Sequence, residues 1–389
     1  MIETSPDIIS VVDLKIGDSI VNPNLKEGDE DMSYELVNIF CKMVQIDSES
    51  GEEEEFIHYL KDLFVTNLQA NCVLDNFGNL IAKIPAKCSN KNESILFGLH
   101  ADTIKPGKNI KPIIKNGIIH SNGETILGAD DKAGIAELFE AIRTADCYPP
   151  IEIVVSKEEE TGLKGSKNID ASFLKSKIGF VIDTDSLENI IIGGPSYMSI
   201  KVDVTGKAAH AGMEPEKGIS SIKAASYAIS ILKEGWIDDE TTVNVGVIRG
   251  GEVLNAVPEK TEVKVECRSQ LHEKCIKRSK LIKQIFVTSA DSIGAMANIT
   301  MELLTKCYRI SENAKSVTIA REAIKSMGLN PKVKVICGGT DAANYNKKGI
   351  EAVVIGMGVQ FEHTKEEKIA IKDMRKGVKI IQKIFKELS

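Results

Sequence analysis

The sequence has 389 residues, of which 42% are hydrophobic and 27% are charged, and its formal net charge is −7. This length exceeds that of one ordinary hydrophobic core and predicts two domains, while the negative charge argues against a nucleic-acid surface. No stretch approaches the roughly 20 apolar residues of a membrane span, and no basic segment followed by an apolar run opens the chain, so neither a membrane anchor nor a signal peptide is expected.

Residues 1–32 are acidic and poorly periodic, and they form an N-terminal extension of unknown role. From residue 33 the pattern becomes helical, and Glu52–Glu55 favour an acidic first helical turn with a structural role only. Short apolar runs then alternate with helical segments, which is the rhythm of an α/β fold with a mostly parallel sheet flanked by helices. The runs are 94–100, 151–156, 178–183, 332–337 and 351–358, and an amphipathic helix is expected over 128–145.

The middle of the chain, 196–307, has a different pattern. Its strands alternate between apolar and polar residues, as expected for a sheet with one solvated face. The order of strand, helix, strand, strand, helix, strand predicts a ferredoxin-like α+β domain. We therefore expect an inserted domain at 196–307, within a larger domain formed by 33–195 and 308–389.

Metal-ligating residue types follow the apolar runs of the larger domain. They are His100 and Asp102 after the first run, Asp130 and Asp131 at the start of the amphipathic helix, Glu158–Glu160 after the second run, Asp183 and Asp185 after the third, and His363 after the last. Ligands of parallel sheets bind outside the carboxyl ends of the strands, so these side chains are expected to gather at one edge.

So many carboxylates in one place would repel one another unless a cation neutralises them. Two imidazoles with three or four carboxylates suit a pair of zinc-like ions roughly 3.5–4 Å apart, bridged by one carboxylate and a water. Magnesium alone would rarely recruit histidine. An acid left over from metal ligation suits the role of a general base for the metal-bound water.

Eight motifs resemble, in order, those of the peptidase T, carboxypeptidase G and succinyl-diaminopimelate desuccinylase family of co-catalytic zinc metallopeptidases. They are HAD, LGADDKAGIA, EEETGLKGS, IDTD, AAHAGMEPEKGIS, GGEVLNAVPEKTEVKVECRS, CGGTDAAN and EHTKEEKI. The resemblance covers about 33–389 and is strongest for the peptidase T-like branch. It implies a zinc exopeptidase-like fold whose inserted domain serves as a lid and dimerisation domain.

The resemblance also implies the metal ligands. One ion would be held by His100, Asp130 and Asp183, and the other by Asp130, Glu160 and His363, with Asp130 as the bridge. Zinc is the expected metal, and manganese or cobalt would also suit these ligands.

Two neighbouring acids would support this pair of ions. Asp102 would accept a hydrogen bond from the His100 ring, and Glu159 would be the general base. The family pattern of two adjacent glutamates leaves Glu158 outside the site.

Several residues keep alternative interpretations. Asp131 could be a helix N-cap or a first-turn acid, and Asp185 could replace Asp183 as a ligand. Glu367 could support the last motif without binding a metal ion itself, or it could be a surface charge. The remaining histidines, His58, His120 and His272, fall in no motif and are interpreted as structural or solvated.

The inserted domain contributes further residues by resemblance. His210 would stabilise the oxyanion in a neighbouring subunit's active site, which requires a homodimer formed through the inserted domains. Arg268 would bind a substrate carboxylate, and Asn255 would assist at the same place. Gly338 and Gly339 would let the backbone approach the substrate, although they could simply form a tight turn. Peptidase T itself carries an arginine at the position of Cys337, so strict tripeptide specificity is not expected.

The expected function is the metal-dependent hydrolysis of amide bonds in small peptides, as a peptidase T-like aminopeptidase or tripeptidase. The alternatives are an N-acyl amino acid deacylase or a related amidohydrolase, and a non-catalytic protein that binds metal or peptide. The eight scattered cysteines include no CxxC pair and indicate reduced thiols, hence a cytoplasmic protein.

Overall fold

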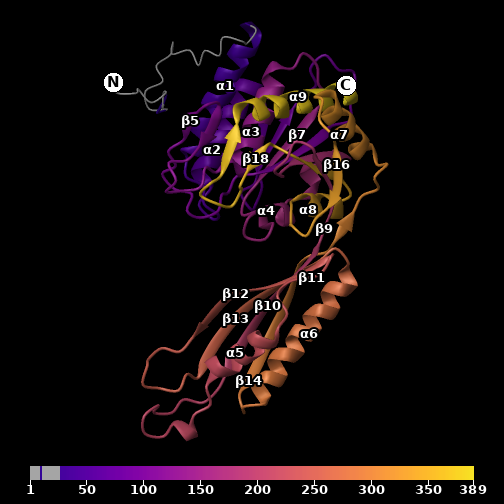
Figure 1. The fold of residues 1–389 in the computed structure, drawn as a ribbon. Helices are drawn as coiled ribbons and strands as arrows, with labels where there is room; N and C mark the ends of the chain where they lie inside the picture. The colour runs from indigo at the N-terminus through magenta and orange to yellow at the C-terminus, as the bar shows by residue number, and fades with distance from the viewer. Residues whose placement is uncertain (1–8, 11–26) are drawn as a thin grey trace, which may run out of the picture. The chain divides into compact units, whose positions relative to one another are not determined.

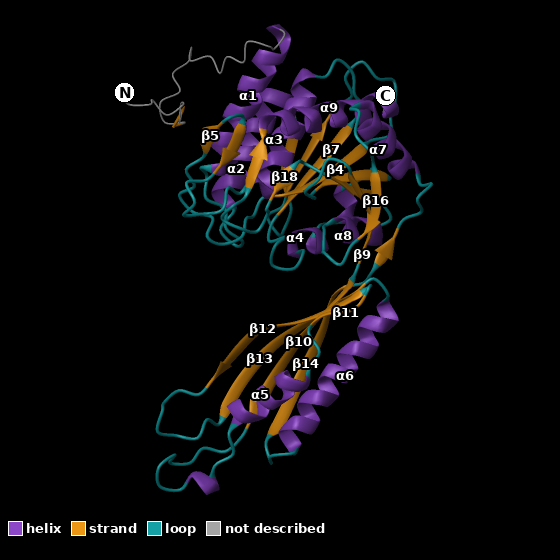
Figure 2. Cartoon of the chain, viewed as in Figure 1, coloured by secondary structure: helices purple, strands orange, loops and turns teal. Residues whose placement is uncertain are grey.

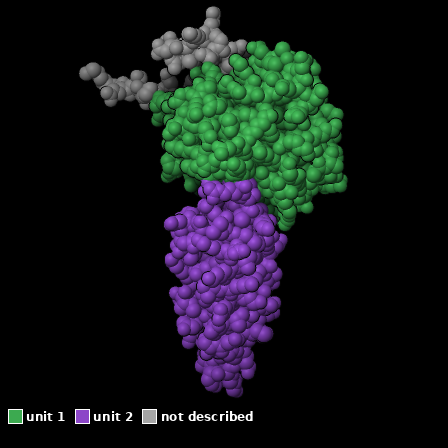
Figure 3. Space-filling view, turned by 90° about the vertical axis from the view of Figure 1, so that its right-hand side faces the viewer, with its two compact units in different colours: residues 1–192, 310–334, 340–389 green, residues 193–309, 335–339 purple. Residues whose placement is uncertain are grey.

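The computed structural model describes residues 9–10 and 27–389, so most of the N-terminal extension lies outside the described residues. The chain divides into two compact units (Figure 3). Unit 1 contains the residues up to Ile192 together with Ile310–Lys334 and Thr340–Ser389, and unit 2 contains Gly193–Arg309 and Val335–Gly339. The predicted larger domain includes 335–339, whereas in the structure these five residues pack with unit 2.

Unit 1 is built around a mixed sheet with the strand order β15-β9-β17-β8-β4-β7-β3-β2, and β16 also pairs with β9. The central strands β17, β8, β4 and β7 are parallel, whereas β9, β3 and β2 run antiparallel to their neighbours. The bounds are β2 (Asn71–Leu74), β3 (Leu80–Ile84), β4 (Ile95–His100), β7 (Ile151–Ser156), β8 (Ile178–Ile182), β9 (Asn189–Gly194), β15 (Tyr308–Arg309), β16 (Lys332–Val335) and β17 (Glu351–Ile355).

Helices cover both faces of this sheet (Figure 1). They are α1 (Glu27–Val44), α2 (Glu54–Leu68), α3 (Ala129–Thr144), α4 (Lys164–Asn168), α7 (Lys315–Ser326), α8 (Ala342–Lys347) and α9 (Ile371–Leu388). Successive side chains of a strand point to opposite faces, and β4 shows which helices cover which face. Phe97 contacts Phe385 of α9, with ring centroids 5.7 Å apart, whereas a Cβ at Gly98 would lie 2.7 Å from the Tyr345 ring of α8.

A second, small antiparallel sheet in unit 1 holds the β18–β19 segment near the C-terminus. Its order is β1-β5-β6-β19-β18, with β1 (Ile9–Ser10), β5 (Ile113–Lys115), β6 (Ile118–His120), β18 (Val359–Gln360) and β19 (Lys368–Ala370). The connection between β18 and β19 carries His363 and Glu367. None of the helices in the described chain is both long and apolar enough to cross a lipid bilayer.

Unit 2 has an antiparallel sheet with the order β11-β12-β13-β10-β14 and two helices (Figure 2). The bounds are β10 (Ser196–Thr205), α5 (Ser221–Ile231), β11 (Gly235–Asp238), β12 (Thr241–Gly250), β13 (Lys260–Ser269), α6 (His272–Asp291) and β14 (Met296–Thr305). Alternate residues of β10 are buried and pack with apolar residues of α5 and α6 in one core. The predicted ferredoxin-like order is confirmed, and β11 is an additional edge strand that the sequence did not predict.

Candidate metal centre

Six of the predicted site residues meet at the carboxyl ends of the central strands. His100 is the last residue of β4, Glu159 and Glu160 follow β7, and Asp183 follows β8. Asp130 lies at the start of α3, and His363 follows β18. Three groups have potential ligand atoms within 4.8 Å of one another: His100, Asp130 and Asp183; Asp130, Glu160 and His363; and His100, Glu159 and Glu160.

The carboxylate of Asp130 lies between the two histidines. Its Oδ1 is 3.1 Å from His100 Nε2, and its Oδ2 is 3.3 Å from His363 Nε2. A further acid lies beside each histidine. Asp183 Oδ1 is 3.8 Å from His100 Nε2, and Glu160 Oε1 is 2.9 Å from His363 Nε2. This geometry could hold two cations with one shared carboxylate, and the mixture of imidazole nitrogen and carboxylate oxygen suits zinc-like ions.

The cluster is largely withdrawn from water and strongly negative. Burial would lower the pKa of His100, but the carboxylates of Asp102 and Asp130 outweigh this effect and raise the pKa well above its usual value. Hydrogen bonds to Asp130 and then Glu160 raise the pKa of His363 to about 11. Burial, reinforced by the charge of Asp183, raises the pKa of Glu159 well above its usual value. The acids thus attract positive charge, which cations can supply in place of protons.

Asp102 contacts both the His100 ring and the glutamate turn. His100 Nδ1 lies 2.9 Å from the backbone carbonyl of Asp102 and 3.5 Å from its carboxylate Oδ1. The carboxylate also accepts hydrogen bonds from the backbone N–H groups of Glu159, at 2.8 Å, and Glu160, at 3.1 Å. Asp102 is therefore placed to orient the His100 ring and the two glutamates together.

Glu367 holds the turn that carries Asp130. Its side chain is 1% exposed, and its carboxylate accepts hydrogen bonds from the N–H groups of Leu127, Gly128 and Asp130 at 2.7–3.0 Å. Burial raises its pKa to about 7, although these backbone donors oppose the shift. The interpretation of Glu367 as a surface charge is therefore wrong.

The structure also separates the competing acids. Asp131 is fully buried in the first turn of α3 and accepts a hydrogen bond from His100 N at 3.2 Å. Asp185 accepts hydrogen bonds from Asn189 and Thr184 and belongs to none of the potential metal groups of the described residues. Glu158 pairs with Lys164. Asp183, rather than Asp185, lies beside His100.

Two buried acids that support the site were not predicted in this role. Glu53 accepts hydrogen bonds from Gly51 N and Glu158 N, although the sequence places it in an acidic helical turn; α2 begins at Glu54. Asp341 accepts hydrogen bonds from the hydroxyls of Ser156 and Ser166, which flank the glutamate turn. Its only signal in the sequence is its place in the CGGTDAAN motif.

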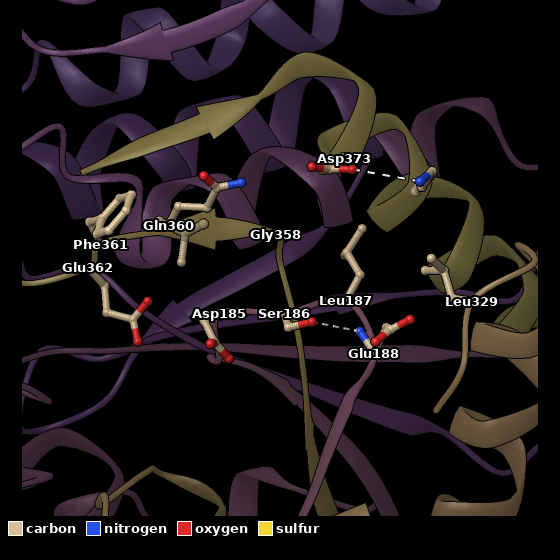
Figure 4. A pocket seen from close by; sticks show the side chains of 12 residues that line it. Asp185, Ser186, Leu187, Glu188, Leu329, Gly358, Gln360, Phe361, Glu362 and Asp373 are labelled. Carbon is tan, nitrogen blue, oxygen red and sulfur yellow. Dashed lines mark hydrogen bonds and ion pairs between the residues drawn. The ribbon is translucent and has the colours of Figure 1, made fainter. Parts of the chain in front are cut away.

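A cavity of about 570 Å³ in unit 1 is lined by Asp185 and Glu362, which are close in the sequence to the candidate ligands Asp183 and His363 (Figure 4). Its walls include apolar side chains from Leu187, Leu329 and Phe361. Glu362 lines the cavity, and Figure 4 shows its carboxylate on the same side as Asp185. Burial raises the pKa of Glu362, and the charges of Asp130 and Asp185 act in the same direction. The carboxylate of Glu362, which lines the cavity, thus interacts electrostatically with the carboxylate of Asp130.

The predicted residues of unit 2 form two separate groups. His210 lies beside Asn255, whose carbonyl accepts a hydrogen bond from Ala211 N at 2.9 Å. Arg268 lies at the other end of β13, where it donates to the carbonyl of Cys337 at 3.4 Å, next to Gly338 and Gly339. Asn255 precedes β13 and Arg268 lies near its end. Their joint role in binding a substrate carboxylate remains a prediction.

Comparison with known proteins identifies the family. Residues 79–216 match peptidase family M28, and residues 192–292 match the peptidase dimerisation domain. An uncharacterised protein of Bacillus subtilis is 35% identical, with 90% of this chain and 98% of that protein aligned. The crystal structure of the aminopeptidase PepT from Bacillus cereus has 34% identity and a TM-score of 0.79, covering 92% of this chain and 98% of the other. A tripeptidase from Staphylococcus aureus has 32% identity, a TM-score of 0.84 and the same coverage.

The fold and these matches define a metallopeptidase with a dimerisation domain. Within that class, the chain belongs to the peptidase T-like branch of the M20 family. The predicted family, fold class and peptidase T-like hydrolase are thereby confirmed. The identity and number of the ions, the roles of the individual residues and the cytoplasmic location remain predictions.

Lys132, two residues after Asp130, gives stability a predictable pH dependence. It is fully buried, donates to the Ile46 carbonyl at 2.7 Å and lies 4.6 Å from the centre of the Phe56 ring. Burial lowers its pKa from 10.5 to about 7. Between these values the unfolded chain binds the proton more tightly, so this group makes the free energy of unfolding rise by about 1.4 kcal/mol per pH unit.

The variant Lys132→Met should lack this rise. The free energy of unfolding of the variant minus that of the natural chain should therefore be highest below pH 7 and should fall steadily toward pH 10. Urea unfolding across that pH range measures this difference. The exposed Lys277→Met is the control and should show a constant difference. A constant difference for Lys132→Met as well would contradict a buried, weakly basic amine.

Proposed function

We propose that this chain hydrolyses the N-terminal peptide bond of small peptides with the help of two divalent ions, most suitably zinc, with manganese or cobalt as alternatives. The observation that carries the proposal is the Asp130 carboxylate, whose two oxygens face His100 and His363 separately. His100, Asp130 and Asp183 would hold one ion, and Asp130, Glu160 and His363 the other. The ions would supply the Lewis acidity that polarises the scissile carbonyl and acidifies a water.

Glu159 has the position expected of the general base. Its carboxylate approaches His100 and Glu160, and its backbone is fixed by Asp102. The residue is 7% exposed, and burial raises its pKa, so its carboxylate has the proton affinity to accept a proton from the attacking water and deliver it to the leaving amine. A non-catalytic binding protein would have no need of this residue.

The cavity lined by Glu362 and Asp185 favours an aminopeptidase over a deacylase. A peptide substrate carries a free ammonium group, which the carboxylates of Glu362 and Asp185 can accept, whereas an N-acyl amino acid carries no charge at that end. The apolar wall formed by Leu187, Leu329 and Phe361 suits the first side chain of a peptide.

We also propose a homodimer formed through unit 2, which contains most of the match to the dimerisation domain. His210 and Asn255 lie side by side in an exposed turn and would act together in the partner's active site. There His210 would stabilise the oxyanion. Arg268, with the backbone of Gly338 and Gly339, would bind the substrate carboxylate.

The variant Glu159→Gln tests the base. Hydrolysis of a free tripeptide should fall by about 10²–10⁴-fold in kcat, because proton transfer is lost while the neighbouring ligands remain. Metal content, measured by mass spectrometry of the metals, should be unchanged. Glu158→Gln is the matched control and should retain activity. Chelation should abolish the activity of the natural chain, and zinc should restore it. An active Glu159→Gln protein would refute the assignment.

Mixed dimers test whether His210 acts across the interface. Glu159→Gln and His210→Ala dimers should each be inactive, but subunit exchange between them would place both lesions in one site and leave the other site intact. Part of the activity should therefore return on mixing. If His210 acts within its own chain, every site keeps one lesion and the mixture stays inactive.

The variant Glu362→Gln tests recognition of the ammonium group. The KM for a free tripeptide should rise about 10–100-fold, which corresponds to the loss of one charge-assisted hydrogen bond, while hydrolysis of its N-acetylated counterpart should hardly change. Glu188→Gln is the control, because Glu188 lines the same cavity but pairs with Lys332 at 2.6 Å. Faster hydrolysis of N-acyl amino acids than of free peptides by the natural chain would favour the deacylase.

A further inference from the structure

Two cysteines that are distant in the sequence face each other at the surface of unit 1. The backbones of Lys87 and Tyr148 exchange two hydrogen bonds, from Lys87 N to Tyr148 O at 3.0 Å and from Tyr148 N to Lys87 O at 2.9 Å. Cys88 and Cys147 flank this antiparallel pair on the same side. Cys88 has a left-handed backbone (φ 57°), so the ladder does not continue regularly, but each cysteine is bonded in the chain to a residue of the Lys87–Tyr148 pair and the two are therefore close in space.

The side chains and their surroundings are suited to a reaction between the two sulfur atoms. The Cys147 thiol is a hydrogen-bonding neighbour of the Cys88 thiol, and this interaction raises the pKa of Cys88. Cys88 is exposed and Cys147 is partly exposed, so a small reagent in solution can reach them. Both thiols are free in the structure.

A second pair of cysteines provides a contrast within the same chain. Cys267 and Cys275 also approach each other, with Cys275 Sγ 3.5 Å from the Cys267 carbonyl, but both side chains are fully buried in the core of unit 2. Reactivity of a thiol depends on access as well as on proximity. Of these two pairs, only the surface pair is open to a reagent in solution.

We propose that Cys88 and Cys147 form a reversible disulfide bond by exchange with a low-molecular-weight disulfide. The Cys147 thiolate attacks one sulfur of the reagent and releases the other as a thiol, which leaves a mixed disulfide. The Cys88 thiolate then attacks the Cys147 sulfur and releases the second reagent thiol. The two protein thiols lose two electrons and two protons, and the reagent disulfide is reduced to two thiols.

The bond would connect the opposite end of the sheet from the metal centre. Cys88 precedes β4 and Cys147 precedes β7, so both lie near the amino ends of these parallel strands. His100, Glu159 and Glu160 lie at or beyond the carboxyl ends. The closed loop contains β4 and α3, and closing a loop of this size restricts the unfolded chain. Oxidation should therefore stabilise unit 1 without changing the site, and this inference does not depend on the proposed function.

The experiment compares the full chain after reduction with dithiothreitol and after incubation with oxidised glutathione. Peptide mapping of the oxidised protein should identify a bond between Cys88 and Cys147, and the Tm should rise by about 5–10 °C. Dithiothreitol should reverse both changes. Cys88→Ser and Cys147→Ser should lack the bond and the rise in Tm, whereas Cys72→Ser, which removes a cysteine of β2, should show both.

Three outcomes would overturn the proposal. The first is a protein that carries only mixed disulfides with glutathione at these positions, since the two sulfur atoms would then be unable to join. The second is an oxidised protein whose intramolecular bond maps to other cysteines. The third is an equal rise in Tm on oxidation of the Cys88→Ser variant.

Discussion

The repulsion among carboxylates at the carboxyl ends of β7 and β8 and at the start of α3 is the constraint on which this structure depends. Asp130 resolves part of it by facing one imidazole with each oxygen, and these two contacts draw segments as distant as β4 and the β18–β19 connection to one point. The remaining acids, Glu159 and Asp183, stay buried at the cost of strongly raised pKa values. Divalent cations would relieve the same repulsion, and this is the physical link between the fold and hydrolytic chemistry.

A second set of carboxylates fixes the backbone that presents these groups. Asp102 receives the N–H groups of the glutamate turn, Glu367 receives those of the turn before α3, and Asp341 receives two hydroxyls beside β7. Hydrogen bonds from neutral donors to an ionised carboxylate are stronger than those between neutral groups, and each carboxylate orients several donors at once. The acids of this region therefore divide into those that face the candidate ions and those that hold the turns.

The sequence predicted what depends on local pattern and on the order of the strands. Apolar runs predicted β4, β7 and β8, and the rule that sites form at the carboxyl ends of strands predicted that His100, Glu160 and Asp183 lie together. The sequence pattern did not predict contacts between segments that are distant along the chain. Nothing near Glu53 shows that it binds the turn after β7, and the pairing of Cys88 with Cys147 depends on how two connections meet. For Asn255 and Arg268, the motif gives the residue types, whereas the length of β13 affects how far apart they lie in one chain.

The chain enters unit 2 twice, first over Gly193–Arg309 and again over Val335–Gly339. The short second segment, Val335–Gly339, supplies the Cys337 carbonyl that accepts a hydrogen bond from Arg268 and the Val335 carbonyl that accepts one from Gln270. A fragment that contains only Gly193–Arg309 would leave the side chains of Arg268 and Gln270 without these carbonyl partners. Unit 2 is therefore not one continuous insertion, and a fragment of it keeps these contacts only if it contains both segments.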